Sequence, residues 1–321
     1  MLRHARNAAL VRMAFGISFV LSVTPVFAYN PNPHLAVNEN GSAPLPGASS
    51  PASPVDGSPA KEIKPYISVS NPSPKQGETV KVILSGLDHE SSDPAFVSFE
   101  GNKIKLFKEK AEGKWSCLLG IPVTIDPGVH KIAFGDTTTR ALKVVDAKYP
   151  TRRLRLPKTK NNFKASPGEK ETIKKAKLAL SDEKRWSGKF EKPVKKARIS
   201  SVFGIRRIVN GKLLKDYFHS GTDFAAPRGT PIYAPADGKV IVAKTGWKLH
   251  GNTICLDHGR GVVSIYIHMN SLKVKEGDMV KAGQHIGAVG STGRASGPHL
   301  HFGVYVNNEA TDPMNWFSKV Y

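Results

Sequence analysis

The residue types that metal-dependent hydrolysis needs are concentrated in the C-terminal third of the chain. The run HLHFGVYV, which begins at residue 299, alternates polar and apolar side chains. Successive side chains of a strand point to opposite faces. We therefore expect its Leu, Phe and Val side chains to pack inward and the remaining polar face to carry His299, His301 and Tyr305.

A second alternating run, Val263–Met269, contains another histidine. Its Val, Ile and Met side chains predict a core face, and Ser264, Tyr266 and His268 are then expected on the other face. Tyr266 would be either a partner that orients His268 or a packing residue. Two strands that each place histidine opposite an apolar stripe predict a metal site.

An earlier His/Asp pair supplies further candidate ligands. His219 and Asp223 flank Gly221, and Phe-Ala-Ala-Pro follows, which favours a turn into a strand. Cys117 and Cys255 are the only cysteines, and we expect two separate buried thiols. A metal site must then use imidazole and carboxylate, which zinc accepts; three such ligands leave one position for water. Zinc lowers the pKa of that water towards about 7.

These motifs resemble those of the lysostaphin-type (LytM) zinc peptidases, family M23. The resemblance covers about residues 199–316 and rests on His-x-x-x-Asp from His219, Tyr-x-His ending at His268, and His-x-His from His299. It implies a C-terminal β-sheet domain like a duplicated hybrid motif. It also implies a Zn²⁺ ion held by His219, Asp223 and His301.

The resemblance gives the two other histidines a catalytic role without metal binding. His268 and His299 would handle protons on the attacking water and steady the developing oxyanion, and either could be the base. The implied activity is that of a zinc metalloendopeptidase acting on peptidoglycan peptide stems and cross-links. The alternative is a non-catalytic LytM-type wall-binding protein or amidase activator, but such relatives have usually lost zinc ligands.

The N-terminal segment and the charge indicate where such a protein would act. Three arginines precede the uncharged stretch Met13–Val26, and Val-Phe-Ala ends at residue 28. This pattern predicts a signal peptide over residues 1–28. We expect an exported, periplasmic or secreted monomer with no stable membrane anchor after cleavage and no nucleic-acid partner. The formal charge of +21 favours an anionic partner such as a wall polymer.

The remaining segments predict an all-β protein with two domains and a helical connector. Residues 29–65 are rich in Pro and Ser and predict a flexible linker. Short alternating runs over 66–147 predict an immunoglobulin-like β-sandwich. Residues 148–198 have a net charge of +13 and predict a basic, partly helical linker, either solvated or attached to an anionic polymer. Within them, Ser166-Pro167-Gly168-Glu169 is typical of a helix cap and predicts a helix from Pro167 to about residue 181. Residues 199–321 form the expected peptidase domain, in which Asp237-Gly238 predicts a hairpin turn between Pro231–Tyr233 and Val240–Val242.

Overall fold

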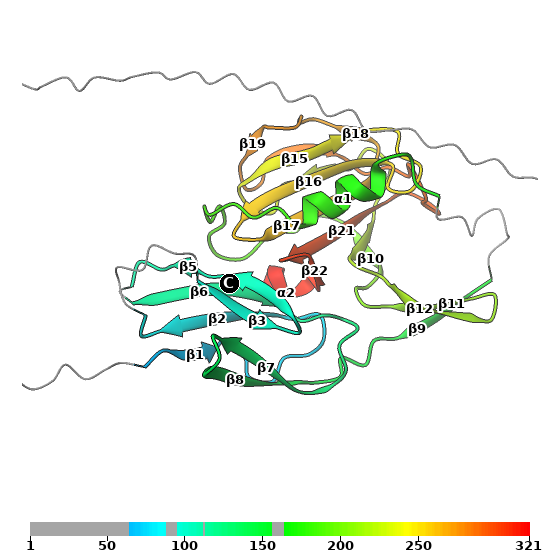
Figure 1. The fold of residues 1–321 in the computed structure, drawn as a ribbon. Helices are drawn as coiled ribbons and strands as arrows, with labels where there is room; N and C mark the ends of the chain where they lie inside the picture. Colours follow the sequence, from blue (N-terminus) through cyan, green and yellow to red (C-terminus); the bar gives the residue numbers. More distant parts are fainter. Residues whose placement is uncertain (1–63, 88–94, 112, 156–163) are drawn as a thin grey trace, which may run out of the picture. The chain divides into compact units, whose positions relative to one another are not determined.

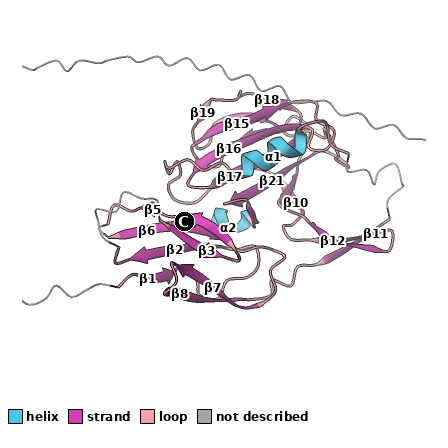
Figure 2. Cartoon of the chain, in the orientation of Figure 1, coloured by secondary structure: helices cyan, strands magenta, loops and turns pink. Residues whose placement is uncertain are grey.

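The computed structural model describes residues 64–87, 95–111, 113–155 and 164–321. The predicted signal peptide and nearly all of the predicted linker over 29–65 lie outside them. The described chain is mostly β-structure (Figures 1 and 2), and residues 60–321 fall in one compact unit. None of the helices in these ranges has the length and apolar character needed to cross a membrane.

The first part of the described chain is a β-sandwich of two antiparallel four-stranded sheets. Apolar side chains from both sheets, among them Val82, Trp115 and Leu142, share one hydrophobic cluster. The short alternating runs predicted short strands in this region but not the order in which they pair. The sheet orders are β1-β2-β6-β5 and β4-β3-β7-β8, with β1 Tyr66–Val69, β2 Thr79–Ser85, β3 Phe96–Phe99, β4 Asn102–Lys105, β5 Phe107–Lys108, β6 Lys114–Gly120, β7 Gly128–Phe134 and β8 Thr138–Val144.

The C-terminal part is organised around an eight-stranded antiparallel sheet. The strands run in the order β10-β13-β21-β17-β16-β15-β19, and β22 pairs with β21. Two central strands, β17 and β21, supply the predicted histidine-bearing runs. The bounds are β10 Arg198–Ser201, β13 Thr222–Ala225, β15 Gly238–Lys244, β16 Asn252–Gly259, β17 Val262–Met269, β19 Met279–Val280, β21 His299–Val306 and β22 Glu309–Thr311.

Two small sheets complete this part of the chain. The first has the order β12-β11-β9, and β9 runs parallel to β11. The second has the order β14-β20-β18. A short helix, α2, follows β22. The bounds are β9 Thr151–Leu154, β11 Arg206–Val209, β12 Lys212–Phe218, β14 Pro231–Tyr233, β18 Ser271–Leu272, β20 His285–Ala288 and α2 Pro313–Ser318.

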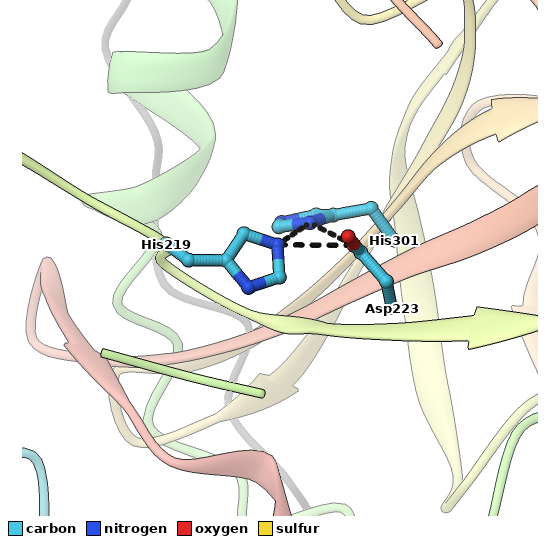
Figure 3. Close-up of side chains that lie close together, drawn as sticks. All are labelled: His219, Asp223 and His301. Carbon is cyan, nitrogen blue, oxygen red and sulfur yellow. Dashed lines mark hydrogen bonds and ion pairs between the residues drawn. The ribbon is translucent and has the colours of Figure 1, made fainter. Parts of the chain in front are cut away.

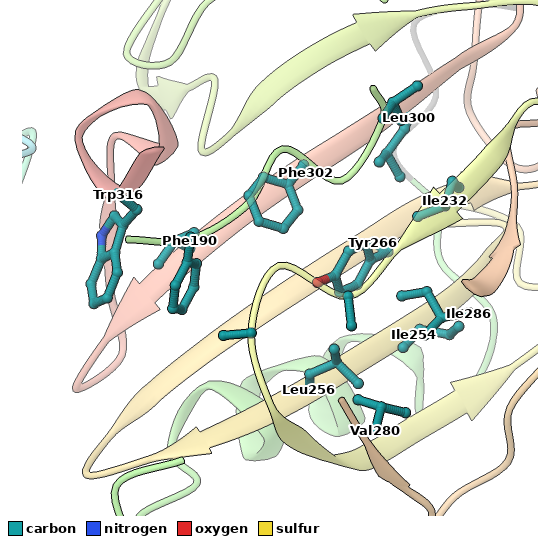
Figure 4. Packing of buried hydrophobic residues seen from close by; sticks show 14 of the residues in the cluster. Phe190, Ile232, Ile254, Leu256, Tyr266, Val280, Ile286, Leu300, Phe302 and Trp316 are labelled. Atoms are coloured by element: carbon teal, nitrogen blue, oxygen red, sulfur yellow. The ribbon is translucent and has the colours of Figure 1, made fainter. Parts of the chain in front are cut away.

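Both faces of the large sheet are covered by apolar side chains. One face carries the cluster around Tyr266, Phe302 and Trp316 (Figure 4). The other face carries Ile265, Ile267 and Tyr305. Buried packing on both faces fixes the register of the central strands, because a one-residue slip would exchange the two sets of side chains.

The described part of the basic connector packs on this sheet. Helix α1 covers Glu169–Lys177 and lies beside the large sheet (Figure 1). Its Ile173 and Ala176 belong to the apolar cluster on the second face. Helix α1 is shorter than the helix expected to run from Pro167 to about residue 181. Gly168 precedes it at φ 71, a left-handed conformation that does not continue into a helix. The hydroxyl of Ser166 accepts from Lys248 N–H at 3.0 Å, so it contacts the sheet domain instead of capping the helix.

The segment after α1 contributes to the core of the first face. Trp186, Phe190 and Val194 are each at most 5% exposed and belong to the cluster of Figure 4. Phe190 N–H donates to Trp316 O at 2.9 Å. The reading of the connector as a solvated spacer therefore does not describe these residues. The domain boundary near residue 199 stays a prediction, and the packing places core residues upstream of it.

The predicted hairpin at Asp237-Gly238 is wrong. β14 pairs with β20, whereas β15 pairs with β16 and β19. The carboxylate of Asp237 accepts from Ala282 N–H at 2.8 Å and from Lys281 Nζ at 2.8 Å. The turn therefore connects strands of two different sheets. The carboxylate of Asp237 binds residues more than 40 positions away instead of closing a hairpin.

Candidate metal centre and catalytic histidines

Three side chains from neighbouring strands converge on one point: His219, Asp223 and His301. His219 directly follows β12, and in the pairing of β13 with β21 Asp223 lies directly opposite His301. His219 Nε2 is 3.0 Å from Asp223 Oδ1 and 2.9 Å from His301 Nδ1 (Figure 3). His301 Nδ1 is 2.9 Å from the same carboxylate oxygen. The structure thus brings together the three residues predicted as metal ligands.

The turn between His219 and Asp223 depends on a glycine. A Cβ atom on Gly221 would lie 2.4 Å from Phe302 O and 2.7 Å from His301 Nε2. The backbone can therefore approach β21 closely only without a side chain at this position. Gly221 allows the chain to carry His219 over β21 and still enter β13 with Asp223 beside His301.

A hydrogen bond fixes the ring orientation of His219. Its Nδ1–H donates to Val202 O at 2.7 Å. In the neutral ring, an Nε2 lone pair then faces the Asp223 carboxylate oxygen, an arrangement that a bound cation satisfies. Such an N–H···O=C contact behind a ligating imidazole is typical of metal sites. The donor set of two imidazole nitrogens and one carboxylate fits zinc.

The charge states of the cluster also suit a cation. Burial disfavours ionisation of Asp223, but its close contacts with the rings of His219 and His301 outweigh this effect and hold the pKa of Asp223 well below its usual range. Burial lowers the pKa of His301. At neutral pH the cluster therefore contains a carboxylate and an unprotonated His301, the forms that bind metal.

The two remaining predicted histidines lie beside the cluster. The ring centroids of His268 and His299 are 4.9 Å apart, and the His268 centroid is 6.5 Å from that of His301. His268 Nδ1–H donates to Thr292 O at 2.9 Å, and His299 Nδ1–H donates to Gly297 O at 2.8 Å. Each ring therefore keeps its Nε2 for other partners. Burial lowers the pKa of His268 to about 3, so it is unprotonated at neutral pH.

His268 reaches this position through an irregularity that strand alternation does not predict. Asn252 pairs with Met269 and Ile254 pairs with Tyr266, so β17 has one extra residue between these pairs. His268, within this bulge, has φ 64. Bulges near active sites commonly redirect a side chain. Without the bulge, alternation would place His268 on the face of Tyr266, opposite the one that carries His301.

Tyr266 is therefore a packing residue. It is fully buried, its ring lies 5.2 Å from that of Phe302, and its hydroxyl is 2.9 Å from Ser264 Oγ. The expectation that Ser264, Tyr266 and His268 share one face is wrong, because both faces of β17 are buried and the bulge turns only His268. The expectation for β21 holds, since Leu300 and Phe302 pack on the first face while Tyr305 packs on the second.

Several supporting residues were missed by sequence reasoning. Thr292 O orients His268, and Val202 O orients His219. Tyr305 O–H donates to Ser220 Oγ at 3.1 Å, next to His219. The partners are backbone atoms or residues distant in sequence, so only the shared face of Tyr305 and His301 gave a signal.

Comparison with known proteins assigns the region. Residues 217–313 match peptidase family M23. The C-terminal region is an M23 domain. This confirms the relationship inferred from the His/Asp spacing. The M23 domain is similar to the peptidoglycan DD-endopeptidase ShyB of Vibrio cholerae, with 43% identity over 126 residues. It is also similar to the DD-carboxypeptidase/endopeptidase Mpg of Neisseria meningitidis, with 42% identity over 123 residues.

These relatives are longer proteins. Each alignment covers 38% of this chain, but only 29% of ShyB and 28% of Mpg. A solved structure described as a candidate M23 peptidase of Pseudomonas aeruginosa matches with TM-score 0.56 and 28% identity. That match covers 77% of this chain and 95% of the other chain. The likeness in fold therefore extends beyond the M23 domain.

Proposed function

We propose that the chain is a zinc-dependent endopeptidase that hydrolyses peptide cross-links of peptidoglycan. The observation that carries the proposal is the complete site: His219, Asp223 and His301 converge within 3.0 Å of one another. His268 and His299 stand beside them with Nε2 left for other partners. A non-catalytic wall-binding protein or amidase activator would not need all five groups.

The three converging residues would hold the metal. When bound, zinc polarises a carbonyl and lowers the pKa of a coordinated water towards about 7. Asp223 supplies the negative charge, and the His219 ring is held in place by Val202 O. Burial of the site disfavours the protonated form of His301, so protons compete less with the metal for its ring nitrogen.

His268 and His299 would complete the reaction. One histidine accepts a proton from the attacking water at Nε2. A ring that also carries a proton at Nε2 donates it to the developing oxyanion or the leaving amine. The carbonyl bonds at both Nδ1 atoms keep the rings aligned during these transfers. Either assignment of base and donor satisfies this geometry.

The substrate proposal draws on the relatives as well as the site. The names of ShyB and Mpg specify DD-endopeptidase and DD-carboxypeptidase/endopeptidase activity, so we propose D-alanyl–diaminopimelate cross-links over Gly-Gly bridges. The same function supports export to the periplasm or outside the cell. The paired four-stranded sheets of residues 66–147 support an immunoglobulin-like sandwich, for which we propose no catalytic role.

Digestion of purified cross-linked muropeptide dimers tests the activity and the bond together. We expect the zinc-loaded chain to convert D-alanyl–diaminopimelate dimers to monomers, identified by mass, and His301→Ala to leave them intact. Dimers that persist with the wild-type chain, together with co-sedimentation of the chain with intact wall, would favour the non-catalytic alternative.

A further inference from the structure

We propose that Glu169, at the start of connector helix α1, is a positioning residue for His268. The inference rests on the proposed function, because it assigns a role in that reaction. Glu169 lies 50 positions before His219, the first of the five site residues, and belongs to the predicted linker. Its carboxylate is nevertheless fully buried, which carboxylates rarely are without specific partners.

All but one of the partners of Glu169 described here belong to one loop of the M23 domain. Its Oε1 accepts from His250 N–H at 2.6 Å, from Leu249 N–H at 3.1 Å, and from His250 Nδ1–H at 2.7 Å. Oε2 accepts from Ser166 N–H at 2.6 Å. Burial opposes ionisation, yet these hydrogen bonds outweigh it and hold the pKa of Glu169 below its usual range. A buried charge with this many donors fixes the loop on the helix.

The same loop holds the backbone of His268. His250 O accepts from His268 N–H at 2.9 Å. The same residue thus contacts Glu169 through its N–H and His268 through its carbonyl. Leu249 O accepts from Arg294 N–H at 3.0 Å, which joins the loop to the segment that includes Thr292. Thr292 O in turn accepts from the His268 ring. The main chain and the ring of His268 are thus both attached to parts fixed by this loop.

The conformation of His268 makes this support necessary. A non-glycine residue with φ 64 occupies a sparsely populated region, and such strain persists only where the surroundings impose it. The close packing of the loop on residues 292–293 leaves little freedom, since a Cβ on Gly251 would lie 2.4 Å from Thr292 Oγ1. Release of the loop by loss of the Glu169 charge would let His268 relax toward ordinary strand geometry. Its Nε2 would then leave the site.

Glu169→Gln in the full zinc-loaded chain tests the inference, with the exposed Glu171→Gln of the same helix as the control. The glutamine keeps the shape but sets an amide N–H₂ against donors. We expect kcat on soluble cross-linked dimers to fall about 10- to 100-fold, as for a displacement of about 1 Å at a catalytic group. KM and zinc content should stay as in the wild type. Hydrogen exchange of the His268 amide should accelerate in Glu169→Gln and not in Glu171→Gln.

Two further comparisons keep the outcomes distinct. Ser166→Ala, which releases only Lys248 N–H from the helix start, should reduce kcat less and serves if Glu169→Gln does not fold. Wild-type kcat and wild-type His268 exchange in a folded Glu169→Gln would overturn the inference. If Glu169→Gln does not fold, wild-type kcat and wild-type His268 exchange in Ser166→Ala would overturn it instead. An equal loss of kcat in Glu171→Gln would also overturn it. If the wild-type chain hydrolyses nothing, the proposed function fails, and the exchange measurement still decides whether Glu169 holds His268.

Discussion

Removal of the Phe190 ring should destabilise the M23 domain although the residue lies in the predicted linker. Phe190 is 3% exposed, and its ring lies near that of Trp316 (Figure 4). Its ring centroid is 4.7 Å from that of Trp316 and 4.9 Å from that of His258. Truncation of a buried Phe to Ala costs about 3–5 kcal/mol because it removes apolar burial and leaves a cavity. We expect Phe190→Ala to lower the free energy of unfolding by about this amount.

Urea unfolding followed by tryptophan fluorescence measures the effect, with the exposed neighbour Lys189→Ala as the control. A loss below about 1 kcal/mol, as expected of a surface substitution, would refute the packing argument. The same reasoning applies to a chain that begins at Ser200. Loss of Trp186, Phe190 and Val194 would remove roughly 5–9 kcal/mol at about 1.5–3 kcal/mol each. Such a chain should not fold, because whole domains are stable by only about 5–15 kcal/mol.

Three further predictions concern the site and the core. Alanine at any one of the three proposed metal ligands should abolish zinc binding in metal analysis, and a full equivalent retained by all three variants would refute the ligand set. His268→Ala and His299→Ala should keep zinc and lose about 10²–10⁴-fold in hydrolysis; loss of zinc would place the residue among the ligands. Burial lowers the pKa of His258 to about 4. The ring therefore takes up a proton at a lower pH in the folded chain than in the unfolded chain. Stability should therefore fall from about pH 6.5 to about pH 4, by roughly 3 kcal/mol at 1.36 kcal/mol per pKa unit. In urea unfolding, the difference in free energy of unfolding between wild type and His258→Gln should become smaller as the pH falls over this range. A constant difference would contradict the prediction.

Local pattern predicted much of the fold and the identity of the site residues. Alternation placed Leu300 and Phe302 in the core, because a regular strand sends neighbouring side chains to opposite faces. The His219/Asp223 spacing around Gly221 indicated a turn into a strand. These features depend on residues that are close in sequence, so the local sequence pattern is enough to predict them.

Features that depend on distant contacts were not predictable in the same way. The bulge at His268 follows from pairing with β16, and β17 alone reads as a regular strand. Glu169 reads as part of a helix cap, but its partners lie about 80 residues away. Lysines surround Phe190 in the sequence and conceal its burial, since charge suggests a solvated segment. In each case contacts with residues distant in sequence determine the structure, although the local sequence pattern favours a different one.

Zinc reconstitution tests the central claim most directly. The chain is stripped of metal with a chelator, zinc is returned in steps, and soluble fragments released from purified peptidoglycan are measured after each step. We predict no release from the metal-free chain and a rise that levels off at about one zinc per chain, as expected for a single site. Asp223→Ala should not respond. Full release by the metal-free chain, or zinc-dependent release by Asp223→Ala, would contradict hydrolysis at the His219/Asp223/His301 site.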